Sequence, residues 1–245
     1  MCIRDRLYNN ASEFYRAENG QPIGYFWGYK TAGIFQNTQE IDEWRAVGNG
    51  ILQSNVQPGD VRFVDRNHDG QINDKDKVNL GNGTPDFTLG LNLGFVYKGF
   101  DFSIVANGAF GQQIVQSYRN HTRPTPNYTT AILDRWHGEG TSNRIPRVTD
   151  SNINYQFSDL FIQNGDYLRL STLTLGYDFA KLFKGKAVSQ ARLYFQVQNL
   201  FTITGYDGMD PEIGFGSSNN SWVSGLDYGY YPRPRTVLVG VNLKF

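Results

Sequence analysis

Cysteine and histidine are scarce in this 245-residue chain, which has one cysteine, Cys2, and three scattered histidines. A single cysteine excludes a disulfide framework and a cysteine-rich zinc site. An excess of charge is also missing, because 23 Lys and Arg residues balance 23 Asp and Glu residues. A neutral chain lacks the basic surface that replaces phosphate counterions, so we expect no nucleic-acid partner.

Long hydrophobic runs are missing as well. No apolar stretch approaches 18 residues and the mean hydropathy is −0.48, which excludes a transmembrane helix. The argument does not exclude strands that face lipid on one side and water on the other, because their apolar and polar residues average out. Aromatic residues make up 15% of the chain, whereas disordered chains are poor in them, so this chain folds.

The N-terminal segment differs from the rest of the sequence. Residues 1–6 have no apolar core and no small-residue cleavage site, so they are not a signal peptide. We interpret them as an assembly scar joined to the middle of a longer gene, with an ordinary frayed terminus as the alternative. Under either interpretation Cys2 has no function.

Strand patterns dominate the chain. From Phe87 to Tyr97 every second residue is apolar, and the residues between them are mostly small or polar. Lys98 and Gly99 predict a tight turn, after which residues 100–110 repeat the alternation. Arg169 and Ser171 interrupt a later strand, which predicts either a β-bulge or a strand end that has left the bilayer. Further strands are expected at residues 167–179, 193–201 and 236–245, with a weaker one at 24–30.

The connections between these strands alternate between short and long. Short turns would gather at one end, and the long segments 31–85, 112–164 and 204–233 at the other. Outer-membrane barrels have this asymmetry, with short periplasmic turns and long extracellular loops. We therefore predict an all-β fold, the C-terminal strands of an incomplete transmembrane antiparallel β-barrel of about six strands within residues 21–245. The chain would end on the periplasmic side.

Two short helices are expected inside the long loops. Residues 37–47 have Asn37 as an N-cap and Glu40 at the capping-box position, and residues 130–136 could form the second helix.

Five stretches of this sequence resemble the SusC/RagA type of TonB-linked outer-membrane transporters of Bacteroidota. The resemblance runs from about residue 21 to the end of the chain. It rests on ordered motifs at residues 21–35 (QPIGYFWGYKTAGIF), 58–65 (PGDVRFVD), 166–177 (DYLRLSTLTLGY), 198–202 (QNLFT) and 231–236 (YPRPRT), ahead of a strand that ends in Phe245.

The resemblance implies a 22-stranded barrel with a plug, in the bacterial outer membrane and without enzymatic activity. Such a transporter imports an oligosaccharide or a peptide with energy passed through TonB, and a surface lipoprotein of the SusD type caps its extracellular loops. Residues 1–20 would be a truncated N-terminal segment, so contact with the TonB complex would lie in parts that this sequence does not include. A secreted calcium-dependent carbohydrate-binding β-sandwich is the second hypothesis, because sandwich strands also alternate.

One segment carries a chemical motif, because residues 65–76 fit the calcium-loop template. Calcium prefers six to eight hard oxygen ligands, and Gly at the sixth position permits the sharp turn of such a loop. A solvated turn without metal is the alternative. The expected ligands are the side chains of Asp65, Asn67, Asp69 and Asp76 and the backbone carbonyl of Gln71.

The long loops are also rich in aromatic side chains. These could stack on sugar rings or pack against a lipoprotein, with loop-core packing or a membrane-interface girdle as the alternatives. Asp207, Asp210 and Glu212 resemble a glycosidase carboxylate pair only superficially, so no catalysis is expected from them. The candidate substrate or partner residues are Trp44, Tyr128, Trp136, Trp222, Tyr228, Tyr230 and Tyr231.

Overall fold

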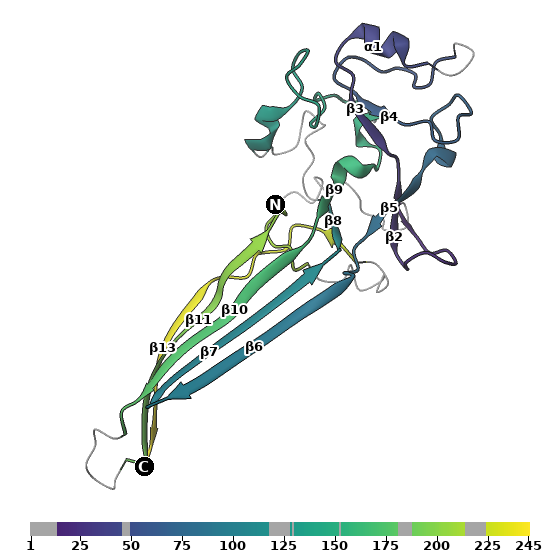
Figure 1. Cartoon of the computed structure of the whole chain (residues 1–245). Helices are drawn as coiled ribbons and strands as arrows, with labels where there is room; N and C mark the ends of the chain where they lie inside the picture. Colours follow the sequence, from purple (N-terminus) through teal and green to yellow (C-terminus); the bar gives the residue numbers. More distant parts are fainter. Residues whose placement is uncertain are drawn as a thin grey trace. The chain divides into compact units, whose positions relative to one another are not determined.

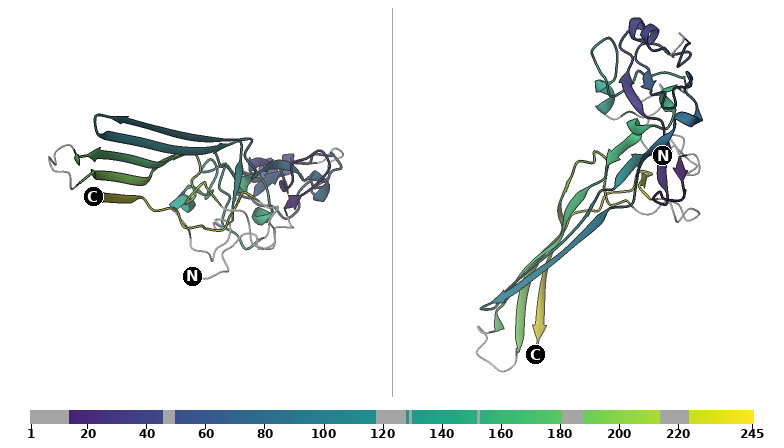
Figure 2. Two further views of the ribbon diagram at one scale, coloured as in Figure 1. Left: turned by 90° about the horizontal axis from the view of Figure 1, so that it is seen from below. Right: turned by 45° about the vertical axis from the view of Figure 1, so that its right-hand side comes forward.

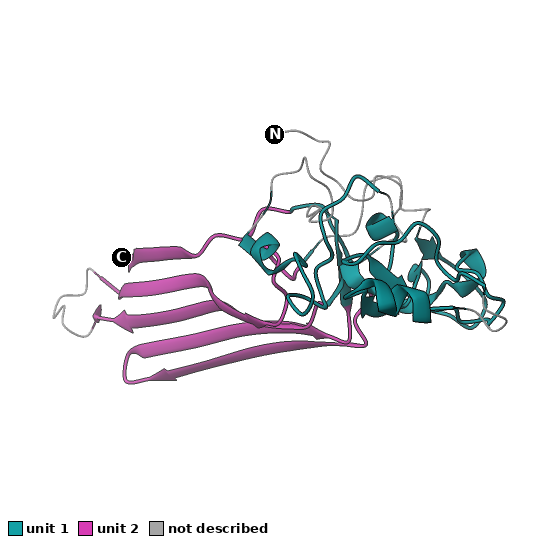
Figure 3. Ribbon diagram, turned by 90° about the horizontal axis from the view of Figure 1, so that it is seen from above, with its two compact units in different colours: residues 1–83, 113–163, 213–229 teal, residues 84–112, 164–212, 230–245 magenta. Residues whose placement is uncertain are grey.

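The computed structural model describes residues 14–45, 50–117, 128, 130–151, 153–180, 188–213 and 224–245. The chain forms two compact units. One comprises residues 1–83, 113–163 and 213–229, and the other comprises residues 84–112, 164–212 and 230–245 (Figure 3). Within the described residues, no helix is both long and apolar enough to cross a membrane.

The second unit is a single antiparallel sheet of five long strands (Figure 1). The strands lie side by side in every view (Figure 2). Their order is β13-β11-β10-β7-β6, so β13 and β6 are the two edges. The strands are β6 (Phe87–Tyr97), β7 (Phe100–Phe110), β10 (Tyr167–Asp178), β11 (Gln190–Thr204) and β13 (Thr236–Lys244).

The predicted turn at Lys98 and Gly99 is confirmed. The two residues have φ angles of 49° and 93°, the left-handed conformation that a two-residue hairpin turn matching strand twist requires. Gly99 takes this conformation without the steric cost that a side chain adds. The turn sets the register of the β6–β7 hairpin, which runs without a break from Tyr97–Phe100 to Phe87–Phe110.

The predicted β-bulge is also present. In the pairing of β10 with β7, Leu170 lies opposite Ala106 and Thr172 opposite Val105, so Ser171 is an extra residue on β10. One inserted residue shifts the side-chain alternation, which explains why the apolar pattern of β10 changes parity at this point. Arg169 therefore lies on the polar face of the sheet, beside Asn107 and Thr202 of the neighbouring strands.

The apolar face of this sheet is exposed. The side chains of Leu91, Phe95, Val239 and Leu243 are 42%, 58%, 70% and 57% exposed, respectively. A β-sandwich would bury these side chains against a second layer. The sheet therefore has the opposite arrangement, in which the apolar side chains face the exterior.

The polar face is held by close contacts between glycine and larger side chains. Arg192 forms an ion pair with Asp101 across the sheet, and a Cβ atom at Gly176 would lie 2.3 Å from an Asp101 carboxylate oxygen. The Tyr194 ring covers Gly240 in the same way, with 2.4 Å from its Cζ atom to the position of a Cβ. The alternation of glycine with large residues in the sequence thus allows this face to pack.

Short connections lie at one end of the sheet, as predicted. Tyr177 pairs with Phe100, and Gln190 pairs with Lys244. These pairs place the 98–99 turn, the 179–189 connection and Phe245 at the same end. The sheet has five strands instead of about six, because the weakest expected strand, residues 24–30, forms β2 and pairs outside this sheet.

The first unit, to which most residues of the expected long loops belong, has its own fold. Its larger core contains the buried side chains of Phe14, Phe26, Val115, Phe157 and Leu226, which come from segments far apart in the chain. Phe14 lies in the segment 1–20, so this part of that segment is integral to the unit. A smaller cluster is formed by Tyr29, Val61 and Phe63.

Short strands and helical turns frame these two cores. The predicted helix at 37–47 is shorter than expected: α1 spans Thr38–Glu43 and Asn37 caps it by accepting a hydrogen bond from the Glu40 amide. The Glu40 carboxylate accepts from the Gln36 amide (2.9 Å). The strands are β1 (Tyr15–Arg16), β2 (Tyr25–Gly28), β3 (Thr31–Ile34), β4 (Val61–Phe63), β5 (Val78–Asn82), β8 (Gln113–Gln116), β9 (Ile162–Asn164) and β12 (Leu226–Asp227), and 3-10 turns span Asp74–Asp76, Thr130–Asp134, Ile153–Tyr155 and Asp159–Phe161.

Candidate functional site

The predicted calcium loop is a tight turn between β4 and β5. Gly70 has a φ angle of 83°, and its amide donates to Asp65 Oδ2 at 3.0 Å. The Asn67 and Asp69 side chains lie on the exposed side of the turn, where Asn67 Nδ2 donates to Asp69 Oδ2 at 2.9 Å. The hydrogen bonds from the Asn67 and Asn73 side chains hold the pKa of the Asp69 carboxyl below its ordinary value. The loop thus keeps an ionised carboxylate at its surface.

Asp76 has a different environment from the other expected ligands. Its side chain is fully buried, and both of its oxygens accept hydrogen bonds from backbone amides. Oδ1 accepts from Arg66 at 2.8 Å, and Oδ2 accepts from Asn73 at 2.8 Å. Asp76 therefore closes the loop by joining its two ends, and it forms a capping box with Asn73 at the start of the 3-10 turn Asp74–Asp76.

Asp65 supplies the unsatisfied group of this loop. Its Oδ1 atom is buried and has no hydrogen-bond partner among the described residues. A buried carboxylate oxygen without a partner loses its hydration with nothing in return. In the part of the chain that the structure describes, no three His, Cys, Asp or Glu side chains gather closely enough to hold a metal ion. The Asn67 side chain and the Gln71 carbonyl could also supply oxygen ligands to a metal ion, and they do not belong to those four residue types.

The candidate aromatic residues divide into packed and exposed groups. The Trp44 ring lies 5.0 Å from the Arg62 guanidinium, and Trp136 donates from Nε1 to Gln36 Oε1 at 3.2 Å. Tyr228 packs against the larger core. These three side chains stabilise the first unit.

The exposed group comprises Tyr128 (37% exposed), Tyr230 (37%) and Tyr231 (87%). Trp222 lies outside the described residues. The exposed tyrosines are the aromatic side chains of the candidate set that a ligand or partner protein can reach without rearrangement of the core.

A buried ionic network in the second unit was not predicted as a site. Arg169, 3% exposed, donates to Asp210 Oδ1 at 2.5 Å, to Glu212 Oε2 at 2.8 Å and to Thr202 Oγ1 at 3.0 Å. Arg233 binds the other Glu212 oxygen at 2.9 Å. The network fastens the segment after β11 and the segment before β13 to the polar face of the sheet.

This network includes two of the three carboxylates that superficially resembled a glycosidase pair, Asp210 and Glu212. Asp210 and Glu212 both form ion pairs with Arg169, so these carboxylates anchor the segment after β11 to the sheet. The signal was present in the sequence, because Arg169, Thr202 and Arg233 all lie within the motifs that carry the family resemblance. Sequence spacing alone did not reveal that these motifs meet.

Comparison with known proteins identifies relatives along nearly the whole chain. TonB-dependent receptor P3 of Formosa agariphila is 34% identical over 92% of this chain and 22% of its own length. TonB-dependent receptor SusC of Bacteroides thetaiotaomicron is 31% identical over 80% of this chain and 18% of its own length. No family model matches.

The fold also matches solved structures. A structure of the RagAB peptide transporter superimposes on 97% of this chain with a TM-score of 0.72 and 22% sequence identity. The match covers 24% of that transporter chain. The chain thus spans about a fifth to a quarter of the length of these relatives. The five-stranded sheet corresponds to part of an outer-membrane β-barrel wall.

Proposed function

Because this chain belongs to the TonB-dependent receptors of the SusC/RagA type, which are outer-membrane proteins, we propose that its sheet forms part of the wall of an active importer. The observation that carries the proposal is the exposed apolar face described above. Such a face meets acyl chains in an outer-membrane barrel, whereas the polar face borders an aqueous lumen. The edges β6 and β13 would pair with further strands of the same barrel, because unpaired backbone groups are costly in lipid.

Charged substitutions on the two faces test this orientation. We expect Val239→Arg to impair assembly of the complete receptor, because Arg on the lipid face costs about 2–4 kcal/mol at the bilayer midplane. The control is Gln196→Arg on β11, which lies on the polar face in the adjacent register position. The measurement is the yield of folded, heat-modifiable barrel in outer-membrane fractions. Equal yields for the two variants would contradict the assignment of the faces.

The imported substrate is proposed to be an oligosaccharide or a peptide, taken up with TonB-coupled energy. RagAB, to which the fold is similar, is described as a peptide transporter. The test measures uptake of a labelled oligosaccharide digest and a labelled protein digest by cells that carry the complete receptor. We expect uptake of one digest to be lost when either the receptor or TonB is deleted. Uptake that survives both deletions would refute the proposal.

A surface lipoprotein of the SusD type is the proposed partner. The exposed side chains of Tyr128 and Tyr231 suit a partner surface, since tyrosine combines a large apolar ring with a polar hydroxyl. Affinity purification of the complete receptor in detergent should recover the lipoprotein, and Tyr231→Ala should reduce its recovery. Trp136→Phe is the matched control, because Trp136 is packed within the first unit. If no lipoprotein is recovered under mild detergent conditions, this partner is wrong.

A divalent cation is proposed for the loop at residues 65–76, with calcium as the ion. The support is the unpartnered Oδ1 of Asp65, together with the oxygens of Asn67 and Asp69 and the carbonyl of Gln71. Six to eight oxygens in a Gly-containing turn are typical of calcium, and water would complete the set. Asp76 would hold the loop closed through its backbone hydrogen bonds.

Calorimetric titration of the complete receptor with calcium tests this site. We expect binding to be lost in Asp65→Ala and Asp69→Ala. Binding should persist in Asp74→Asn, a neighbouring carboxylate that is 86% exposed and paired with Lys77. Absence of binding heat at millimolar calcium, the weak end of extracellular calcium sites, would end the proposal.

A further inference from the structure

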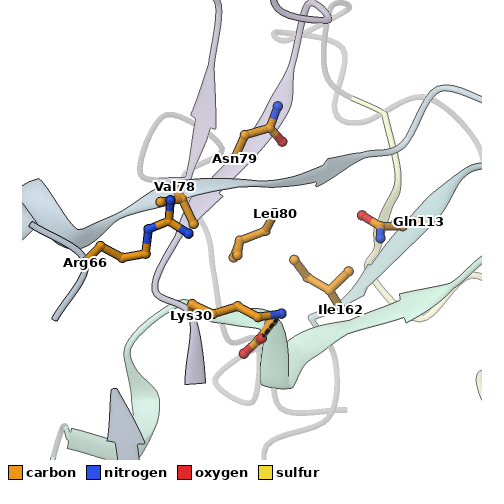
Figure 4. A pocket seen from close by; sticks show the side chains of 8 residues that line it. Lys30, Arg66, Val78, Asn79, Leu80, Gln113 and Ile162 are labelled. Carbon is orange, nitrogen blue, oxygen red and sulfur yellow. Dashed lines mark ion pairs between the residues drawn. The ribbon is translucent and has the colours of Figure 1, made fainter. Parts of the chain in front are cut away.

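The first unit contains a pocket of about 350 Å³, a size at the lower end of the range for small-ligand sites (Figure 4). Five segments of the chain bring its walls together. Val78, Asn79 and Leu80 come from β5, Gln113 comes from β8, and Asp159 and Ile162 come from the 3-10 turn and β9. Lys30 and Arg66 complete the lining.

One wall of the pocket is aliphatic. Figure 4 shows the side chains of Leu80 and Ile162 facing the same space, with Val78 beside Leu80. Leu80 and Ile162 are also in contact with the larger core, so the wall is fixed in place. A wall of this kind favours an apolar group on the ligand.

The pocket is lined by more cationic than anionic side chains, and these side chains differ in whether they already form an ion pair. Lys30 and Arg66 are cationic, and Asp159 is the single anionic residue of the lining. Asp159 is already occupied: Oδ2 binds Lys30 Nζ at 2.8 Å, and Oδ1 accepts hydrogen bonds from the Thr31 amide and hydroxyl. The Arg66 side chain has no ion pair or hydrogen bond among the described residues. The lining therefore offers one cation without an ion pair, Arg66, and a net positive charge, and its single carboxylate is already occupied.

The side chain of Gln113 leaves a hydrogen-bond acceptor at the pocket without a donor. Its Oε1 atom is buried without a hydrogen-bond partner in the described part of the chain. It lies against Gly81, where a Cβ would be 1.5 Å away, so only glycine permits this position of the carboxamide. An N–H group that reached this oxygen would remove the cost of an unsatisfied buried acceptor.

We propose that this pocket binds the C-terminal residue of a peptide that has an aliphatic side chain. The α-carboxylate would bind Arg66 and Lys30, the side chain would lie on Val78, Leu80 and Ile162, and the backbone N–H would satisfy Gln113. None of the eight lining residues is aromatic, so the pocket lacks the flat platform on which a sugar ring stacks. The inference rests on the import function proposed above and selects peptides as its substrate class.

The test measures binding of N-acetyl-leucine by saturation-transfer NMR and calorimetry, with the complete receptor in detergent at a fixed calcium concentration. Binding is measured without transport, so its failure is distinct from failure of import. We expect N-acetyl-leucine to bind, and N-acetyl-leucine amide and N-acetyl-glycine to bind at least tenfold more weakly. Glucuronic acid, which has a carboxylate on a sugar ring, should also bind at least tenfold more weakly.

Variants connect this binding to the pocket. Arg66→Gln should weaken N-acetyl-leucine at least tenfold, because it removes a charge-assisted hydrogen bond. Arg144→Gln is the matched control, since Arg144 is exposed and does not line the pocket. The Asp76 hydrogen bond to residue 66 uses the backbone amide and is kept in the variant. Equal affinity of the acid and its amide, equal affinity of glucuronic acid, or no effect of Arg66→Gln would each overturn the proposal.

Discussion

Replacement of Arg169 by methionine is expected to release the segments that flank β11 and β13. Arg169 is 3% exposed, and its guanidinium binds Asp210 Oδ1, Glu212 Oε2 and Thr202 Oγ1. Methionine has a similar length but no charge. The substitution would leave the Asp210 carboxylate, which is 6% exposed, without its counter-ion. Loss of one partner of a buried ion pair costs about 3–5 kcal/mol.

This cost should appear as local opening, because the network holds segments outside the strand pairs. The measurement is hydrogen exchange, followed by mass spectrometry, in peptides that cover residues 205–213 and 230–235 of the complete receptor. A loss of about 3–5 kcal/mol corresponds to exchange that is roughly 10² to 10⁴ times faster, up to the limit set by the original protection. Peptides from β6 and β7 should be unchanged.

Arg192→Met provides the matched control. Arg192 pairs with Asp101 on the same face of the sheet, but the two side chains are 22% and 27% exposed. Water can solvate the carboxylate that remains, so the expected cost is about 1 kcal/mol. A second control is the double variant Arg169→Met with Asp210→Asn, which removes both charges and should restore part of the protection. If Arg169→Met accelerates exchange no more than Arg192→Met does, burial does not determine the strength of this network, and the argument is refuted.

Three further predictions concern the remaining contacts. Gly240→Ala should lower the free energy of unfolding by about 1–3 kcal/mol, because the new Cβ would overlap the Tyr194 ring. Combining it with Tyr194→Ala should reduce this loss. Additive losses of the two substitutions in denaturant unfolding would contradict the prediction. Asn37→Ala should lower helix stability by about 1 kcal/mol and Asn37→Ser should not, as measured by exchange of the Glu40 amide, whose partner is the Asn37 side chain. A hydrogen bond and the charge of Lys77 hold the pKa of Asp74 in the folded chain below its ordinary value. The ion pair therefore stabilises the fold fully at pH values above the pKa of Asp74 in the unfolded chain. This stabilisation is lost as the pH falls through the lower pKa of the folded chain. Lys77→Met should raise the pKa of Asp74 in an NMR titration, and an unchanged value would exclude Lys77 as the cause.

The long strands could be predicted from the sequence because their signals are local. Each side chain of a strand that faces lipid on one side alternates with one that faces water, so Phe87–Tyr97 shows its structure in its own residues. The turn at Lys98 and Gly99 and the extra residue at Ser171 are likewise visible as changes in a local pattern. The change of parity at Arg169 indicated the bulge as one of two alternatives, the other being a strand end outside the bilayer.

The sites were harder to predict, because many of the contacts that define them join residues that are far apart in the chain. The expected calcium ligands are neighbours in sequence, yet the structure gives Asp76 a role in closing the loop that spacing alone did not reveal. Trp44 and Trp136 look like exposed loop aromatics in the sequence, and their packing depends on Arg62 and Gln36.

The sequence by itself determined the strands, their two faces and the alternation of short and long connections, since these follow from the covalent order of residues and the two-residue period of a strand. Only the tertiary structure decided that residues 31–83 and 113–163 build a unit with its own core, that Arg169 meets Asp210 and Glu212, and that Lys30, Arg66 and Gln113 border one pocket. The physical reason is that hydrophobic burial and charge pairing act through space, whatever the distance along the chain. A local sequence pattern therefore does not show which residues distant in the chain come into contact.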